Sequence, residues 1–125
     1  MKLDYDCVRN ILLTVESLNF NTQLNNDNAH FFPLLHEYHD DKLQYTIKRM
    51  AEAGFISNEC VLTMVSGNVR YYISELSWDG HQFLDHIRDE NVWQTTKSKT
   101  DKFLNSIPAK LLVAITAKII QSQID

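Results

Sequence analysis

The stretch that decides the fold spans residues 40–80 and reads DDKLQYTIKRMAEAGFISNECVLTMVSGNVRYYISELSWDG. Its first part predicts a helix over residues 40–53, because apolar side chains recur there at helical spacing on one buried stripe: Leu43, Ile47 and Met50. We expect Asp40 to cap this helix and Gly54 to end it in a left-handed conformation. Phe55 would then contact Met50, as in a Schellman motif.

A β-hairpin is predicted next. Residues 60–65 and 69–74 are rich in β-branched and aromatic side chains, and Ser66-Gly67-Asn68 joins them. We then expect Ser77 to cap a further helix whose apolar members are Trp78, Phe83, Leu84 and Ile87.

Outside this stretch, the pattern predicts helices at both ends of the chain. An N-terminal helix, capped by Asp4 or Asp6, would bury Val8, Ile11, Leu12, Val15 and Leu18. Residues 91–105 are expected to be helical, with Val92, Trp93 and Phe103 as anchors, and a last helix would run from Pro108 to about Gln123. Residues 19–28 are rich in Asn, which favours turns, and Pro33 would confine any strand near it to a sheet edge.

Composition indicates one globular domain that is not polybasic. The chain has 125 residues, of which 44% are hydrophobic, and its formal net charge is −4. Lysines gather near the C-terminal end, where they could contact an acidic body, another subunit or phosphate: Lys97, Lys99, Lys102, Lys110 and Lys118.

Nothing in the sequence predicts secretion or a membrane span. The first residues are acidic and lack the apolar core of a signal peptide, and the apolar stretch 107–120 is short and carries two lysines. Cys7 and Cys60 are far apart and form no Cys-x-x-Cys pair, so we expect them to be reduced. The predicted location is the cytoplasm.

The order of these elements predicts the fold class. It is α+β, mainly α: a winged helix-turn-helix-like domain with a two-stranded wing over residues 1–90. A C-terminal helical extension, residues 91–125, would pack on this domain or on a partner. Residues 50–56, MAEAGFI, resemble the Leu-x-x-Ala-Gly-Leu-Ile ending that precedes the wing in many winged helix-turn-helix proteins. Residues 76–80, LSWDG, resemble the Leu-Thr-x-x-Gly start of the helix after it.

A narrower resemblance covers nearly the whole chain. MKLDYDCVR at residues 1–9, YTI at 45–47, EAGFI at 52–56 and LSWDGHQFLD at 76–85, followed by IRD at 87–89, resemble the domain-of-unknown-function family 2513. That family consists of small proteins of bacteria and their phages. The resemblance implies a winged-helix fold and a prophage setting, and it brings no catalytic or binding residues with it.

The predicted recognition helix and the wing supply a candidate surface for double-stranded DNA. The candidate contacts are polar or basic: Lys42, Gln44, Tyr45, Lys48, Arg49, Asn68 and Arg70. Asp41 and Glu52 lie on the same surface and would repel phosphate. The alternative interpretation is a solvated helix face on a module that binds another protein. The DNA hypothesis fails if Lys48, Arg49 and Arg70 point away from one common surface.

Catalysis, a metal and a cofactor are not expected. His36 and His39 have the spacing of two zinc ligands on a helix, but no matching set of thiolates or carboxylates accompanies them. No hydrolase, nucleotide-binding or metalloprotease motif is present.

The last helix is apolar almost all round, which predicts that it is buried. It could fold back onto the first helix, pair with a second copy in a homodimer, or contact a membrane surface. The candidate dimerisation residues are Leu111, Leu112, Ile115 and Ile119.

Taken together, these features predict a small cytoplasmic regulator, phage-derived and dimeric, that binds DNA without catalysis. The alternative is a winged-helix module that binds a protein, as an antirepressor or a modulator of a host factor.

Overall fold

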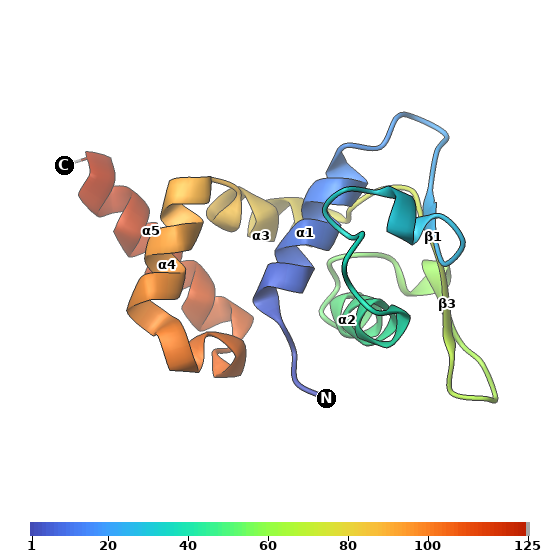
Figure 1. Ribbon diagram of the computed structural model, residues 1–125. Coiled ribbons are helices and arrows are strands. Elements are labelled where there is room, and N and C mark those ends of the chain that lie inside the picture. The colour runs from blue at the N-terminus through green and yellow to red at the C-terminus, as the bar shows by residue number, and fades with distance from the viewer. Residues whose placement is uncertain (125) are drawn as a thin grey trace.

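Helix α1 (Tyr5–Glu16) runs through the middle of the molecule, as Figure 1 shows. The computed structural model describes residues 1–124, apart from the side chains of residues 101, 102 and 124. Helix α2 (Asp40–Glu52) and the sheet lie on one side of α1, and the C-terminal helices lie on the other. This architecture confirms the predicted fold class at the level of α+β, mainly α.

Local signals in the sequence set the start of α1. The Asp4 carboxylate accepts hydrogen bonds from the backbone N–H groups of Asp6 and Cys7, at 2.9 and 3.3 Å. The stripe predicted to be buried is buried at Val8, Ile11, Leu12 and Val15, and Leu18 is half-buried. Burial raises the pKa of the Cys7 thiol to about 11, and Cys7 and Cys60 are both free thiols, as predicted.

Helix α2 spans almost the predicted range, but Asp40 does not cap it. His39 occupies the N-cap position without a side-chain hydrogen bond to the helix, so Asp40 is the first helical residue. The reason is a competing partner, because Asp40 Oδ1 lies 2.9 Å from His30 Nε2. His30 belongs to a short 3₁₀ turn (Ala29–Phe31) in the region that the sequence left undefined.

The end of α2 confirms the predicted Schellman motif. Gly54 has φ +83°, a backbone conformation that glycine adopts without strain. The N–H of Phe55 donates to the Met50 carbonyl at 2.9 Å, and the N–H of Gly54 donates to the Ala51 carbonyl at 3.1 Å. The chain is thereby turned sharply out of the helix, through a second 3₁₀ turn (Asn58–Cys60), into the hairpin.

The hairpin consists of β2 (Val61–Thr63) and β3 (Val69–Ile73), which pair antiparallel with Leu62 opposite Arg70. The sheet has a third strand that the sequence did not predict. This strand, β1 (Leu24–Asn25), pairs with β3 and gives the order β1-β3-β2.

Asn26 extends this pairing with its side chain. Its Nδ2 donates to the Val69 carbonyl, and its Oδ1 accepts from the Tyr71 N–H, both at 2.9 Å. A side-chain amide carries one donor and one acceptor group, as a peptide group does, and can therefore replace a strand residue.

The two motifs on either side of the hairpin meet at one junction. Helix α3 (Trp78–Ile87) is capped by Ser77, whose Oγ accepts from the Gly80 N–H at 3.0 Å, as predicted. The same hydroxyl donates to the Gly54 carbonyl, and the Ser77 N–H donates to the Phe55 carbonyl at 3.0 Å. A Cβ at Gly80 would lie 2.3 Å from that Phe55 oxygen, so this contact requires glycine.

The last helix of the C-terminal extension packs on α3 and α4 (Glu90–Thr100). After α4, a 3₁₀ segment (Asp101–Ser106) and α5 (Ala109–Ile124) follow in order. Helix α5 lies against α3 and α4, so the expectation that it folds back onto the first helix was wrong. It buries only one side, because short connections place the helices that precede it on that side.

Two apolar side chains differ from their predicted roles. Trp78 and Phe103 were expected to be apolar anchors, but they are 78% and 70% exposed. Phe83 and Leu104 occupy the neighbouring core positions instead. Trp78 and Phe103 lie on a side of their segments that the rest of the chain leaves open to solvent.

Side chains of α1 hold the C-terminal extension in place. Tyr5 Oη donates to the Ile107 carbonyl at 2.5 Å, and Asp6 Oδ1 accepts from the Trp93 indole N–H at 2.8 Å. The buried Arg9 donates to the Ile87 and Arg88 carbonyls, each at 2.8 Å. These carbonyls are at the C-terminal end of α3, where a cation is favourable.

An ion pair joins the C-terminal ends of α1 and α3 and gives a pH-dependent contribution to stability. Arg88 holds the Glu16 carboxylate with two hydrogen bonds, and this lowers the pKa of Glu16. We expect Glu16→Gln to lower the free energy of unfolding by about 0.5–1 kcal/mol at neutral pH. A carboxyl whose pKa is lowered by folding stabilises fully above its unfolded pKa, so the difference from wild type should shrink as pH falls below about 4.5.

Urea titrations of both proteins at pH 7 and below pH 4 would measure this difference. A difference that stays constant over this range would show that Glu16 acts through packing rather than charge.

Candidate nucleic-acid interface

The outer side of α2 and the turn of the hairpin border a groove of about 340 Å³. Helix α2 buries its other side, and the hairpin projects beyond it at the edge of the molecule (Figure 1). The side chains that line the groove from α2 are Asp41, Gln44, Tyr45, Lys48 and Arg49. Gly67, Asn68 and Val69 line it from the hairpin, so five of the seven predicted contacts share one surface.

Gln44 fixes the hairpin against α2. Its Oε1 accepts from the Val69 N–H at 2.8 Å, which joins the middle of the helix to the start of β3. Helix α2 and the hairpin, which form the two walls of the groove, are therefore fixed relative to each other.

Arg49 is oriented within the groove by two neighbours. Its guanidinium carbon lies 5.3 Å from the centre of the Tyr45 ring, and its Nη2 lies 2.8 Å from Glu52 Oε1. Its Nε is buried and has no hydrogen-bond partner among the residues that the structure describes. Arg49 is thus held at the surface with one face on an aromatic ring and part of its charge offset by a carboxylate.

Lys48, the other cation of the groove, has no carboxylate partner like that of Arg49 in the described range of the chain. It is half-buried, and within residues 1–124 it makes no ion pair. Lys48 and Arg49 face Asp41 and Glu52, so positive and negative charges are balanced close to the groove. Contacts here would depend on shape and hydrogen bonding as much as on charge.

Two predicted contacts lie outside the groove. Lys42 Nζ lies 2.5 Å from Asp4 Oδ2, which raises the pKa of Lys42 and directs it toward the start of α1. Arg70 Nη2 lies 3.9 Å from Asp27 Oδ2, next to β1. Arg70 therefore does not line the groove that Lys48 and Arg49 share. The condition set for the DNA hypothesis, a common surface for all three cations, is met only by Lys48 and Arg49.

The histidine pair considered for zinc does not share a helix, because His36 lies in a turn before α2. His36 Nδ1 lies 3.1 Å from the His30 carbonyl, and His39 caps α2. Among the described residues, no group of three or more His, Cys, Asp or Glu side chains could hold a metal ion. No helix in the described part of the chain is long and apolar enough to span a membrane.

The candidate dimerisation residues divide between the inside and the outside of the molecule. Leu112 and Ile119 are buried within the chain itself. Ile115 is half-buried and Leu111 is 52% exposed, so only these two reach the surface. A dimer through all four side chains would require α5 to leave α3 and α4.

The fold and the groove define a class: a small, mainly helical α+β protein in which a helix and a hairpin form one polar surface. The family model described as "Hypothetical protein (DUF2513)" matches residues 2–106, and the chain belongs to this family. The match includes the whole α2–hairpin–α3 unit and ends before α5. No curated protein sequence and no solved structure matches the chain.

Proposed function

We propose that this chain is a cytoplasmic winged-helix protein that binds double-stranded DNA without catalysis. Helix α2 would enter the major groove, and the β2–β3 hairpin would be the wing that contacts the adjacent minor groove. The observation that carries the proposal is the groove in which Tyr45, Lys48 and Arg49 of α2 face Asn68 of the hairpin.

The connectivity supports this proposal. A helix, a short strand, an irregular segment with a 3₁₀ turn, a second helix and a hairpin follow one another, and the first strand pairs with the last. This is the order of elements in a winged-helix domain, with α2 at the place of the recognition helix. Here the irregular segment, residues 26–39, stands where such a domain has its middle helix.

The types of side chain in the groove support duplex DNA as the ligand. Lys48 can neutralise a phosphate, and Arg49 and Asn68 can donate to base edges or to the sugar–phosphate backbone. Tyr45 holds the Arg49 guanidinium before any ligand binds, so less conformational entropy is lost on binding.

Salt dependence tests the proposal. We expect fluorescence anisotropy with a random-sequence duplex to show binding at low salt. The slope of log K against log salt should be about −1 to −2, because Lys48 and Arg49 would neutralise one or two phosphates. No binding even at low salt would contradict the proposal and favour the alternative, a module that binds another protein.

Removing the carboxylate beside Arg49 should strengthen binding. In Glu52→Gln, Arg49 loses its acidic partner and the groove gains net positive charge. We expect about a two- to fivefold gain in affinity for duplex DNA at low salt, and a smaller gain at high salt.

Asp85→Asn is the matched control, since Asp85 pairs with Arg88 on α3 in the same i, i+3 arrangement. An equal gain in both variants would assign the effect to net charge rather than to the groove. Dimeric binding to two half-sites and a phage-derived origin stay predictions.

A further inference from the structure

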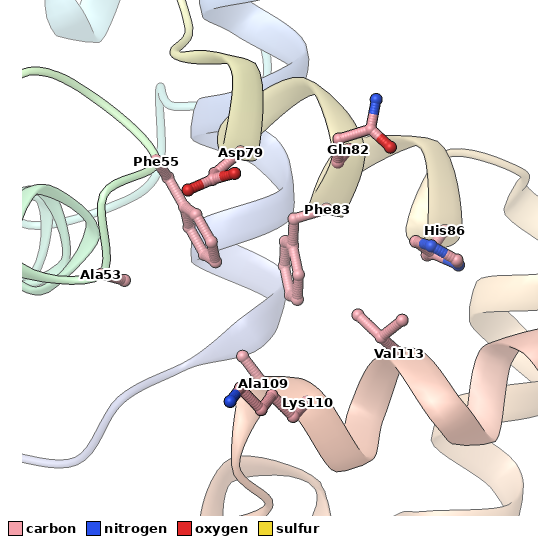
Figure 2. Close-up of a pocket in the computed structure, with 9 residues that line it drawn as sticks. All are labelled: Ala53, Phe55, Asp79, Gln82, Phe83, His86, Ala109, Lys110 and Val113. Carbon is pink, nitrogen blue, oxygen red and sulfur yellow. The ribbon is translucent and has the colours of Figure 1, made fainter.

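A second cavity, of about 460 Å³, lies between α3 and the start of α5, away from the α2–hairpin groove. Figure 2 shows Phe55 and Phe83 side by side in its wall, with Val113 and Ala109 of α5 opposite. The two rings are stacked with their centres 4.6 Å apart, which gives the cavity a flat apolar side.

Polar side chains surround this apolar centre without engaging one another. Asp79, Gln82 and His86 extend from α3, and Lys110 extends from the start of α5 (Figure 2). Within residues 1–124 none of the four makes a hydrogen bond or an ion pair. Asp79 and Lys110 thus place one negative and one positive charge on different walls of the cavity.

A large apolar side chain extends the surface beyond the cavity. Trp78 is 78% exposed and lies one helical turn before Gln82, on the same side of α3. A small ligand would fill the cavity and leave Trp78 in water, whereas a protein segment would cover the Trp78 ring as well.

We propose that this α3–α5 cavity binds an amphipathic segment of a partner protein. One aromatic or leucine side chain of the segment enters the cavity against Phe83 and Val113. A basic side chain before or after this anchor pairs with Asp79, and an acidic one on its other side pairs with Lys110. The proposal is independent of the DNA-binding function, because the two surfaces share no lining residue.

Selection from a phage-displayed library of random peptides tests this proposal. We expect the enriched peptides to carry an aromatic residue or leucine with one basic and one acidic neighbour. The synthetic peptide should bind the wild-type protein and lose about tenfold or more in affinity for Val113→Trp, which fills the cavity.

A charge exchange keeps the test informative if Val113→Trp disturbs folding. Asp79 and Lys110 are exposed, so the double variant Asp79→Lys with Lys110→Glu should keep its circular dichroism spectrum. It should prefer a peptide in which the basic and acidic residues are exchanged. Peptides that bind both variants as they bind wild type would overturn the proposal. A second contradicting result is that no peptide is enriched, although the dye 1-anilinonaphthalene-8-sulfonate binds the wild-type protein and not Val113→Trp. That result would indicate that the cavity binds a small molecule.

Discussion

Gly80→Ala is expected to lower the free energy of unfolding by about 3 kcal/mol and the melting temperature by roughly 10 °C. A methyl group at this position would lie 2.3 Å from the Phe55 carbonyl oxygen. That oxygen cannot move away freely, because it accepts the Ser77 N–H and belongs to the turn that ends α2. The substitution would therefore separate α3 from α2 and disturb the relation of α2 to the hairpin.

Helix propensity alone predicts that Gly80→Ala raises the free energy of unfolding, so the measurement distinguishes the two effects. Gly80 has an ordinary helical backbone, and alanine in place of glycine within a helix stabilises by about 0.5–1 kcal/mol when nothing opposes it. Ser98→Ala on the exposed side of α4 is a suitable control, since it changes propensity without a steric conflict. Thermal unfolding that shows Gly80→Ala to be as stable as wild type would contradict the close contact at this junction.

Reversing both groove cations, in Lys48→Glu with Arg49→Glu, is expected to weaken binding to duplex DNA by about thirtyfold or more at low salt. The variant loses two phosphate or base contacts and adds two carboxylates beside Asp41 and Glu52. Stability should change little, because both side chains are only half-buried and neither supports the core. Anisotropy titrations with one labelled duplex would measure the change.

The matched control is Lys99→Glu with Lys110→Glu, which makes the same change in net charge away from the groove. If this control loses as much affinity as the groove variant, DNA is held by overall charge and α2 is not the recognition helix.

Elements whose signals are local were predictable from the sequence. The end of α2 depends on Met50, Gly54 and Phe55 within one turn, and the start of α3 depends on Ser77 and Gly80. Each of these contacts joins residues close in the chain, so the pattern of residue types carries the information. The same holds for the β2–β3 hairpin, although its strands are shorter than predicted.

Features that depend on distant partners were not predictable. Asn26 stands in an Asn-rich stretch that favours turns, and its role as a strand substitute exists only because β3 lies beside it. Arg70 pairs with Asp27 and Lys42 pairs with Asp4, so both cations lie outside the groove. The partners are far apart in the sequence, so no local spacing predicts either pair. The outline of the candidate surface, through Gln44, Lys48 and Asn68, was therefore predictable, as were its acidic neighbours Asp41 and Glu52, but the loss of Lys42 and Arg70 from it was not.

The most direct test of DNA binding by the α2–hairpin groove is to follow amide chemical shifts in ¹⁵N-labelled protein as duplex DNA is added. The account predicts that the largest changes cluster at residues 44–49 of α2 and residues 67–69 of the hairpin. Amides around Phe83 and Val113 should change little, since the second cavity is a separate surface. Changes confined to α3 and α5, or no changes at low salt, would contradict the proposed function.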